Sequence, residues 1–400
     1  MFGSIYIGLS GLAAYSRGLQ QISNNVANLN SQGFKGSTVS FENILGANSR
    51  SNNGYGGATG NGVQNAPGRL NFAAGELRQT DRDLDLAIQG GGLLMLMRGN
   101  DVMYTRTGSF DIDKSGYIVL SGTDWRLATL DASGRPQTLS VDVSRTNPPK
   151  ATTSVPFTGF IATDATTPPT VGNITIFDKN GGKHVWTVTA TKDTSATATP
   201  GTWNITVNDT NGPLKDGTGA NAQPQTKQLK FIGAIADPSA SKLDFTDPGS
   251  GTVVTLDFSG AQSFAGASST LSAGSVDGYG VGTFAALAVN DSGQLEVSYS
   301  NGQKQQLGAV AIADFRDTSD LTQESSGMFS ARETAMRDIL PSGDVRVGKV
   351  QSRRLEASNV DLTLEFSDLI LVQRGFQASS QIISATNDMI QQLFGIRGQG

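Results

Sequence analysis

The sequence contains no cysteine and only one histidine in 400 residues. Without thiols the chain can form neither disulfide bonds nor thiolate metal sites. A chain exported in an unfolded state would gain from this, because no stray disulfide could trap it, but absence by chance is the open alternative. His184 has no second imidazole and no triad motif to support it, so we expect a cross-strand or exposed residue.

Charged residues are also scarce, at 16% against an average of about 25%. The net charge of -5 gives no electrostatic reason to expect binding to nucleic acid or to an anionic membrane. No run approaches the roughly eighteen apolar residues of a spanning helix. No Lys or Arg precedes the mildly apolar first fourteen residues, which argues against a cleaved signal peptide.

Glycine is abundant, with 49 residues, which is typical of β-rich domains with many tight turns. Several Asp-initiated turns resemble fragments of calcium loops, beginning at Asp113, Asp131, Asp178, Asp209 and Asp291. None has the full spacing of calcium ligands, so hairpin corners are predicted instead. The triple glycine 90–92 is followed by a strand-like run and predicts a turn or bulge rather than a phosphate loop.

Apolar residues recur every seven positions at both ends of the chain, which predicts a helix at each end. With a second row offset by four, they are predicted to form a seam on which copies assemble: Ile5, Leu9, Leu12, Leu19, Ile22, Val26, Leu362, Phe366, Leu369, Phe376, Ile383, Ile390 and Phe394. Polar members of that second row are predicted to set the register: Ser16, Ser23, Gln373, Ser380 and Asn387. Ordinary surface helices are the alternative, but the matched stripes at the two termini favour assembly.

A rough free-energy comparison supports coupling between folding of the ends and association. Burial of four aliphatic side chains does not offset the conformational entropy lost when about twenty residues become ordered. The N-terminal helix therefore needs its C-terminal counterpart and neighbouring copies to be stable.

The interior contains a compositional break, because no Arg and no Glu occur between Arg145 and Glu296. We predict an inserted antiparallel β domain at 147–283, and the flanking segments 76–146 and 284–356 as two halves of an inner β domain. Residues 31–75 are rich in Gly, Asn and Ser, so a flexible linker is the default expectation, and ordering against neighbouring copies is the open alternative. The fold class is thus α+β, mainly β, nested and discontinuous, with terminal helices at 1–30 and 357–400 forming a coiled-coil inner domain.

Alternation of apolar and polar residues locates the strands of both β domains. In the insert they are expected at 171–177, 184–190, 203–207, 229–235 and 253–258. In the flanking halves they are expected at 84–88, 93–97, 102–105, 117–120 and 125–130, and at 284–289, 294–299, 307–313 and 345–350.

Motifs at both ends resemble those of the axial proteins of the bacterial flagellum, the rod and hook family. The segments 10–12 and 22–35 are similar to its N-terminal signature, 355–362 and 371–377 to its C-terminal one, and 81–90 and 104–110 to its first β domain. The matching motif residues are Asn24, Asn25, Asn28, Gly33, Phe34, Lys35, Ala357, Ser358, Asn359, Val360, Asp361, Gln373 and Arg374. Leu93, Leu94 and Phe376 depart from the pattern without disturbing its apolar character.

Within this family the large insert favours a hook subunit over a distal rod protein. The resemblance implies a self-assembling structural protein that forms a curved helical tube and transmits torque as a flexible joint. It also implies no enzymatic activity, no cofactor and no metal. The implied partners are further copies of the chain, the distal rod protein, the hook-filament junction protein, the hook cap protein and the flagellar export apparatus. The implied location is the extracellular hook.

Two other classes of protein fit parts of the sequence. A secreted β-rich adhesin would explain the middle of the chain but not the terminal stripes. An enzyme acting on a glycan would need two convergent carboxylates in a cleft.

Overall fold

The computed structural model describes residues 2–45, 60–66, 68–195, 201–210, 212–216, 223–266 and 268–397. The chain is mainly β with one long helix near each terminus, α1 (Phe2–Ala27) and α2 (Leu362–Arg397), as predicted. Neither of the described long helices is apolar enough to cross a membrane. The coiled-coil arrangement of the helices stays a prediction.

The chain divides into two compact units. Unit 1 contains residues 1–142, 286–297 and 305–400, and therefore carries both helices. Unit 2 contains residues 143–285 and 298–304. The insert predicted at 147–283 lies within unit 2, which also contains residues 298–304 of the segment predicted as the second half of the inner β domain. The meaning of the predicted segments as independent domains stays a prediction.

The β part of unit 1 is built on one extended antiparallel sheet with the order β30-β31-β8-β7-β11-β10-β9-β6-β33, onto which β12, β29 and β32 also pair. Its strands are β6 (Asp85–Gln89), β7 (Leu93–Arg98), β8 (Asp101–Thr105), β9 (Thr107–Ile112), β10 (Ile118–Leu120), β11 (Arg126–Leu130), β12 (Pro136–Thr138), β29 (Ala311–Phe315), β30 (Leu321–Gln323), β31 (Met328–Ala331), β32 (Arg337–Pro341) and β33 (Lys349–Ser352). Strands from before and after unit 2 pair within this sheet, for example where Leu94 of β7 pairs with Ile312 of β29.

Several smaller sheets contain further strands, some of them in unit 1. The strand β5 (Leu77–Gln79) pairs with β34 (Arg354–Glu356). A four-stranded sheet has the order β13 (Thr146–Asn147), β26 (Gly282–Val289), β27 (Gln294–Tyr299) and β28 (Lys304–Ala309). Short 3-10 turns occur at η1 (Val141–Ser144), η2 (Thr318–Asp320) and η3 (Ser325–Gly327).

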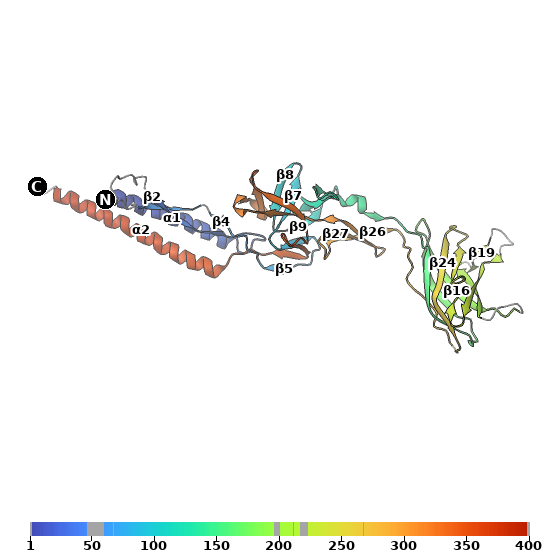
Figure 1. Ribbon diagram of the computed structural model, residues 1–400. Coiled ribbons are helices and arrows are strands. Elements are labelled where there is room, and N and C mark those ends of the chain that lie inside the picture. The colour runs from blue at the N-terminus through green and yellow to red at the C-terminus, as the bar shows by residue number, and fades with distance from the viewer. Residues whose placement is uncertain are drawn as a thin grey trace, which may run out of the picture. The chain divides into compact units, whose positions relative to one another are not determined.

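The flexible linker expected at 31–75 is wrong for the described part of that segment. It forms β1 (Ser37–Thr38), β2 (Phe41–Leu45), β3 (Gly60–Asn65) and β4 (Arg69–Leu70), and β2 pairs antiparallel with β3. The hairpin lies along α1 (Figure 1), where the Val63 N–H donates to the Ser10 hydroxyl at 3.2 Å. Gly62 permits this approach, because a Cβ there would lie 2.2 Å from the Ser10 hydroxyl.

Unit 2 is a ten-stranded sheet with the order β15-β16-β17-β21-β22-β24-β14-β25, joined by β18 and β23. Its strands are β14 (Ser154–Ala162), β15 (Thr170–Phe177), β16 (Lys183–Lys192), β17 (Thr202–Asp209), β18 (Gly212–Pro213), β21 (Thr226–Ile232), β22 (Ile235–Ala236), β23 (Lys242–Thr246), β24 (Val253–Phe264) and β25 (Ser272–Ala273). A separate small pair is formed by β19 (Lys215–Asp216) and β20 (Gln223–Pro224). Inward-facing residues include the fully buried Trp186, Phe157, Phe245 and Phe258.

The expectation of a wholly antiparallel insert is wrong, because β14 and β24 pair in parallel. No tight turn can join two parallel strands, so the chain crosses the whole unit between them. From the end of β24 it returns along β25, which runs antiparallel to β14. This return brings Tyr279 back beside Lys150, where the two form a β-bridge.

The predicted Asp-initiated hairpin turns are present where the structure describes them. The Asp113 carboxylate accepts hydrogen bonds from the Ser115 and Tyr117 N–H groups, and Asp131 makes the same turn. Gly90 ends β6 and its backbone touches that of Gly348 so closely that a Cβ would clash. The strand expected at 345–350 is wrong at its start, because a turn occupies those residues and β33 begins at Lys349.

Candidate assembly site: the terminal helices and a buried polar junction

The two terminal helices pack against each other in antiparallel fashion (Figure 1). Contacts run from Gly8 beside Ile383 at one end to Asn25 beside Glu365 at the other. Between them, Gly11 lies against Ser379 and Gly18 against Val372. We call these facing residues the helix seam: Gly8, Gly11, Tyr15, Gly18, Asn25, Glu365, Val372, Gly375, Ser379 and Ile383.

Small residues in the helix seam allow this close approach. A Cβ at Gly375 would lie 2.4 Å from the Tyr15 ring, so that aromatic side chain occupies the space a larger residue would need. Val372 fits against Gly18 in the same way, with 3.4 Å between a Cβ at that glycine and the valine methyl. At Gly8, Gly18 and Gly375 a larger side chain therefore packs against a glycine, whereas Gly11 faces the small Ser379.

Many of the predicted seam residues flank this contact instead of forming it. Ile22 is buried, while others are half-buried, namely Ile5, Leu12, Leu19, Val26, Leu369, Ile383 and Ile390. Leu9, Leu362, Phe366 and Phe376 are exposed in the single chain. The side chain of Phe394 lies outside the described residues. The role of these residues in contacts between copies stays a prediction.

In α2, the polar residues predicted to set the register each lie one position after a buried residue. Gln373, Ser380 and Asn387 are exposed, as is Ser23, and Ser16 is half-buried. The residues one position earlier in α2 are the buried ones: Val372, Ser379 and Thr386. The pattern of apolar repeats did not predict this buried row, because the contact of the two helices within one chain depends on small residues. Setting of register between copies stays a prediction.

A buried cluster of charges lies where both terminal segments join the β part of unit 1. We call it the polar junction, and its centre is Glu356, with Lys35 and Arg106 on its two oxygens. The Lys35 ammonium lies 2.6 Å from Glu356 Oε1, and Arg106 Nε lies 3.0 Å from Oε2. All three side chains are at most 1% exposed.

The remaining polar atoms of the polar junction are satisfied by backbone groups. Lys35 donates to the Ala73 carbonyl at 2.7 Å, and Arg106 donates to the carbonyls of Gly92 and Ile88. The Gly75 N–H donates to Glu356 Oε1 at 2.7 Å. Ion pairs that are fully hydrogen-bonded in this way can offset the cost of removing the charges from water.

The amide side chains of two motif asparagines connect the segments around the polar junction. Asn359 accepts from the Gly36 N–H at 2.9 Å and donates to the carbonyls of Asn71 and Ala73. Asn25, which is 1% exposed, donates to the Ser37 carbonyl and to Glu365, both at 2.8 Å. Each amide therefore ties one terminal segment to the residues that follow α1.

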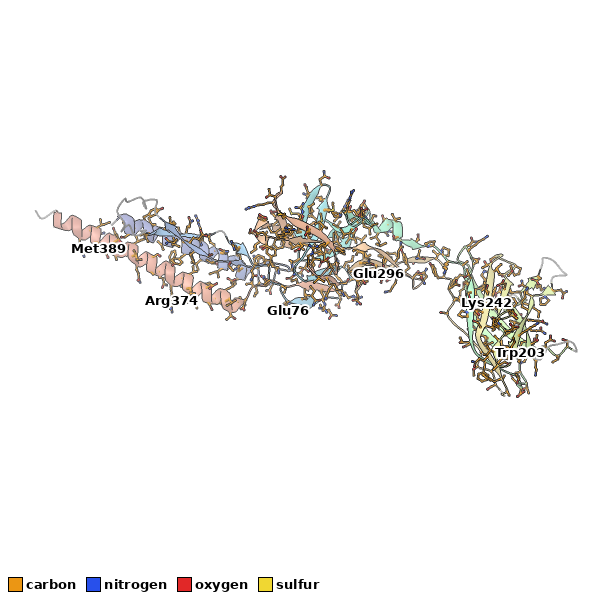
Figure 2. The ribbon with its side chains drawn as sticks, viewed as in Figure 1. Glu76, Trp203, Lys242, Glu296, Arg374 and Met389 are labelled. Carbon is orange, nitrogen blue, oxygen red and sulfur yellow. The ribbon has the colours of Figure 1, made fainter. Side chains whose placement is uncertain are left out.

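The other motif residues shape the helix ends and the chain path. Asp361 caps α2 by accepting from the Thr363 N–H at 2.8 Å. Gly33 adopts a φ of 66° and its N–H donates to the Glu356 carbonyl at 2.8 Å. Asn28 donates to the Asn24 carbonyl at the end of α1. Of the rest, Phe34 is buried, Ala357, Ser358 and Val360 are half-buried, and Arg374 is exposed on α2 (Figure 2).

Two of these charged groups have shifted pKa values. Burial lowers the pKa of the Lys35 ammonium, and the neighbouring Glu356 carboxylate opposes that shift. Burial raises the pKa of Glu365, opposed by the hydrogen bond from Asn25 and reinforced by repulsion from Asp368. The helix seam therefore contains a carboxyl group whose ionisation opposes folding.

Sequence reasoning did not identify Arg106 and Glu356 as partners of Lys35. The signal that was available is that Lys35 is the single charged residue of the motif stretch 22–35 and Arg106 that of 104–110, while 355–362 offers two acidic residues, Glu356 and Asp361. Since Lys35 and Glu356 are 321 positions apart, no local spacing rule could pair them.

We predict that Lys35→Met destabilises unit 1 by about 3 to 5 kcal/mol, because it leaves the Glu356 carboxylate buried with one cation fewer. Urea unfolding would be followed by fluorescence of Trp125, with Trp186 and Trp203 replaced by Phe in every protein. The matched control is Arg346→Met, which breaks an exposed 3.0 Å pair with Asp338 and should cost at most about 1 kcal/mol. Equal costs for the two variants would contradict a structural role of the polar junction.

We predict that Glu365→Gln makes the helix pair more stable than wild type at neutral pH, but not in acid. A raised pKa means that the folded chain holds this proton more tightly, so stability falls as pH rises from below 4.5 through the raised value. Glutamine keeps an oxygen to accept from Asn25 and does not titrate. Thermal unfolding of the helical circular dichroism signal at pH 4 and pH 7 tests this, with exposed Asp388→Asn as control. If the difference in unfolding temperature between Glu365→Gln and wild type is the same at both pH values, the assignment of a raised pKa to Glu365 is refuted.

Three family models match separate parts of the chain. Residues 5–35 match the flagella basal body rod protein model, and residues 143–279 match the D2 domain of flagellar basal body protein FlaE. Residues 351–396 match the C-terminal model of the flagellar basal body rod FlgEFG proteins. The first and third matches contain α1, α2 and most of the polar junction, and the second falls in unit 2.

Full-length relatives are similar along nearly the whole chain. The flagellar hook protein FlgE of Escherichia coli is 27% identical, covering 97% of this chain and 98% of the relative. FlgE of Borreliella burgdorferi is 27% identical, covering 99% and 100%, and FlgE of Salmonella typhimurium is 26% identical, covering 97% and 98%.

A crystal structure of Helicobacter pylori flagellar hook protein FlgE2 aligns with 12% identity and a TM-score of 0.45, covering 71% of this chain and 100% of that one. The assignment rests on the sequence matches, which place rod-type segments at both ends, a D2 domain between them and hook proteins along the full length. The chain belongs to the flagellar rod and hook family, as a homologue of the flagellar hook protein FlgE.

Proposed function

We propose that this chain is the structural subunit of a flagellar hook and polymerises into a curved helical tube that transmits torque through a bend. The observation that carries the proposal is an apolar surface left on α2 after it has paired with α1. Full-length similarity to hook proteins supports the same role.

The apolar surface of α2 follows one face of the helix. Its residues, which we call the α2 stripe, are Leu364, Leu371, Ile382 and Met389, and they are 48 to 66% exposed. Figure 2 labels Met389 near the end of this row. Their spacings of 7 and 11 residues keep them aligned on an α-helix. Complete burial of each is worth about 2 kcal/mol, which a single chain does not obtain.

Further copies of the same chain are the proposed partners of the α2 stripe. A head-to-tail contact that does not close on itself generates an open helical polymer, so one type of subunit can build a tube. The apolar contacts near the helices would persist during bending. Unit 2, with many exposed Thr, Asn and Lys side chains, suits weaker contacts that exchange as the tube turns.

The proposed partners at the ends of the tube are the distal rod protein on one side and the hook-filament junction protein on the other. The hook cap protein would guide assembly, and the flagellar export apparatus would deliver the chain without cleavage of a signal peptide. The subunit would then act outside the cell and without catalysis. These proposals depend on the hook assignment.

The rival functions have less support. A distal rod role fits the end segments, but a match to the D2 domain at 143–279 favours the hook. A glycan-cleaving enzyme needs two close carboxylates, one with a raised pKa. Among the described residues, Glu365 is the carboxyl group with a raised pKa, and it faces Asn25 in the helix seam.

We predict that Leu371→Asp combined with Ile382→Asp abolishes tube formation without unfolding the chain. Both residues are exposed in the single chain, so their charge opposes contact between copies only. The control, Gln377→Asp with Gln381→Asp, adds the same charge at exposed polar positions and should still assemble. Electron microscopy with circular dichroism decides it, and normal tubes from the Leu371/Ile382 variant would contradict the role of the α2 stripe. Charging Leu369 and Ile383 is a poorer test, because both are half-buried and Ile383 lies against Gly8.

We predict that replacing residues 147–282 by Asn-Gly leaves a chain that forms thinner or straighter tubes. Thr146 and Thr283 are paired across β13 and β26, so a two-residue turn can join them without moving either strand. Tube diameter and curvature in electron micrographs give the result. Tubes of unchanged diameter and curvature would show that unit 2 contributes neither property.

A further inference from the structure

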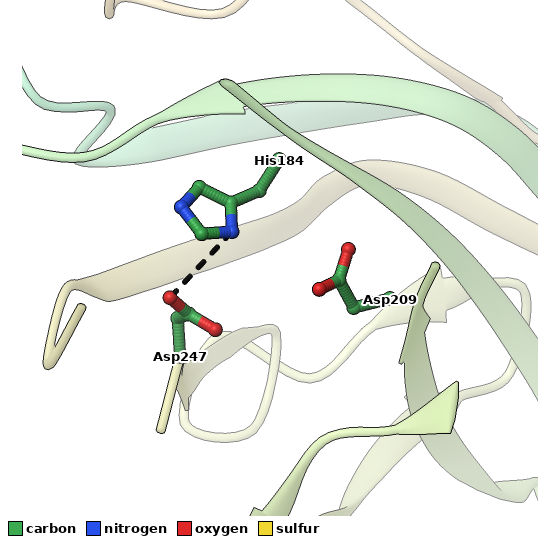
Figure 3. Close-up of side chains that lie close together, drawn as sticks. All are labelled: His184, Asp209 and Asp247. Carbon is green, nitrogen blue, oxygen red and sulfur yellow. Dashed lines mark ion pairs between the residues drawn. The ribbon is translucent and has the colours of Figure 1, made fainter. Parts of the chain in front are cut away.

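Three side chains with metal-ligating atoms meet in unit 2, namely His184, Asp209 and Asp247. One ligand atom from each lies within 4.8 Å of the other two (Figure 3). Asp247 is 3% exposed, and the other two are half-buried. The cluster is thus set into the surface of the unit.

The fold brings these residues together from separate parts of unit 2. His184 is the second residue of β16, and Asp209 is the last residue of β17, the strand paired with β16. Asp247 follows β23, whose pairing partner is β24. A ligand held by all three would therefore link the β16 and β17 pair to the β23 and β24 pair.

The imidazole of His184 has an orientation suited to metal binding. The Asp178 Oδ1 atom accepts from the N–H groups of Asn180 and Gly182, and its Oδ2 atom lies 3.5 Å from His184 Nε2. A proton on Nε2 facing that carboxylate leaves the Nδ1 lone pair directed toward Asp247 Oδ2, 3.7 Å away. Metal-bound histidines commonly have such a carboxylate on the second nitrogen.

Within the part of unit 2 that the structure describes, no Lys or Arg forms an ion pair with either carboxylate on the Nδ1 side. Asp247 Oδ2 accepts from the Ser250 N–H and hydroxyl groups, which are neutral. Asp209 accepts from the Thr210 hydroxyl at 3.3 Å among the described residues. Since three carboxylates, counting Asp178, surround one imidazole, a bound cation would relieve their mutual repulsion.

We propose that His184 Nδ1 and one oxygen each from Asp209 and Asp247 bind a divalent transition metal of the zinc type, with water completing the coordination. Metal bonds of about 2.0 to 2.2 Å place tetrahedral ligand atoms about 3.4 Å apart. The Nδ1 to Asp247 distance is close to that value, and the ligand atom of Asp209, within 4.8 Å of the other two, would have to approach them on metal binding. Calcium and magnesium prefer all-oxygen sites, so the imidazole selects against them.

Metal binding would stiffen unit 2 by crosslinking strands that are not neighbours in the sheet. This proposal is independent of the hook assignment, because it depends on residues of unit 2 alone. The proposal also gives His184 a role as a metal ligand, whereas the sequence predicted only a cross-strand or exposed residue. Asp209, predicted as a hairpin corner, gains a second role.

The test is titration of the full-length protein with Zn²⁺ by isothermal calorimetry, together with thermal unfolding in the presence and absence of the metal. The α2 stripe variant Leu371→Asp with Ile382→Asp would serve as the background if wild type forms tubes. We expect one tight site per chain and a rise in unfolding temperature that a chelator reverses. Mg²⁺ should give neither effect.

Two variants identify the ligands. Asp209→Asn and His184→Gln should each weaken the tight site at least tenfold, and circular dichroism confirms that they fold. Asp164→Asn is the matched control. Its neighbour Thr163 accepts a hydrogen bond from Lys192, which lies at the opposite end of β16 from His184. The Asp164→Asn variant should therefore bind zinc as wild type does. Equal zinc binding by Asp209→Asn and wild type, or no tight site in wild type, would overturn the proposal.

Discussion

The carboxylate of Glu356 is the point on which the architecture of unit 1 depends. It joins Lys35, which follows the N-terminal helix, to Arg106, which lies between β8 and β9, while its own backbone leads into α2. Removing such a group leaves two buried cations without a counter-charge, which is far more costly than losing an exposed pair. The resulting constraint fixes where both helices leave the β part, and the asparagine contacts of Asn25 and Asn359 align them from there.

Once the exits are fixed, small residues decide how the helices pair. Glycines at 8, 11, 18 and 375 allow α1 and α2 to approach closely and leave large apolar side chains on other faces. A helix pair with larger contact residues would bury more apolar area internally and leave less for other chains. The same glycines therefore have two effects. They let the two helices pair closely, and they leave an apolar surface that is suited to polymerisation.

Much of the strand pattern was predictable because alternation is a local property. The expected strand at 184–190 corresponds to β16 (Lys183–Lys192), and 203–207 to β17 (Thr202–Asp209). β14 was missed because Pro156 and Gly159 interrupt its pattern, although the strand persists through a register shift after Pro156. The ordering of residues 37–45 and 60–66 was missed because glycine and asparagine suggest flexibility, while here Gly62 enables contact with α1. The polar junction and the row of buried small residues were missed because both depend on residues from opposite ends of the chain.

The separation of 321 positions between Lys35 and Glu356 has a consequence for the order of folding. Contacts between distant residues form late, because a long loop must close before they contribute any stability. Unit 2 comes almost entirely from one continuous stretch, 143–285, and can therefore fold while unit 1 still lacks its last strands and α2. The helix α1 acquires its partner only after α2, at Leu362–Arg397, has been synthesised, so the helix pair is among the last parts of the chain to form.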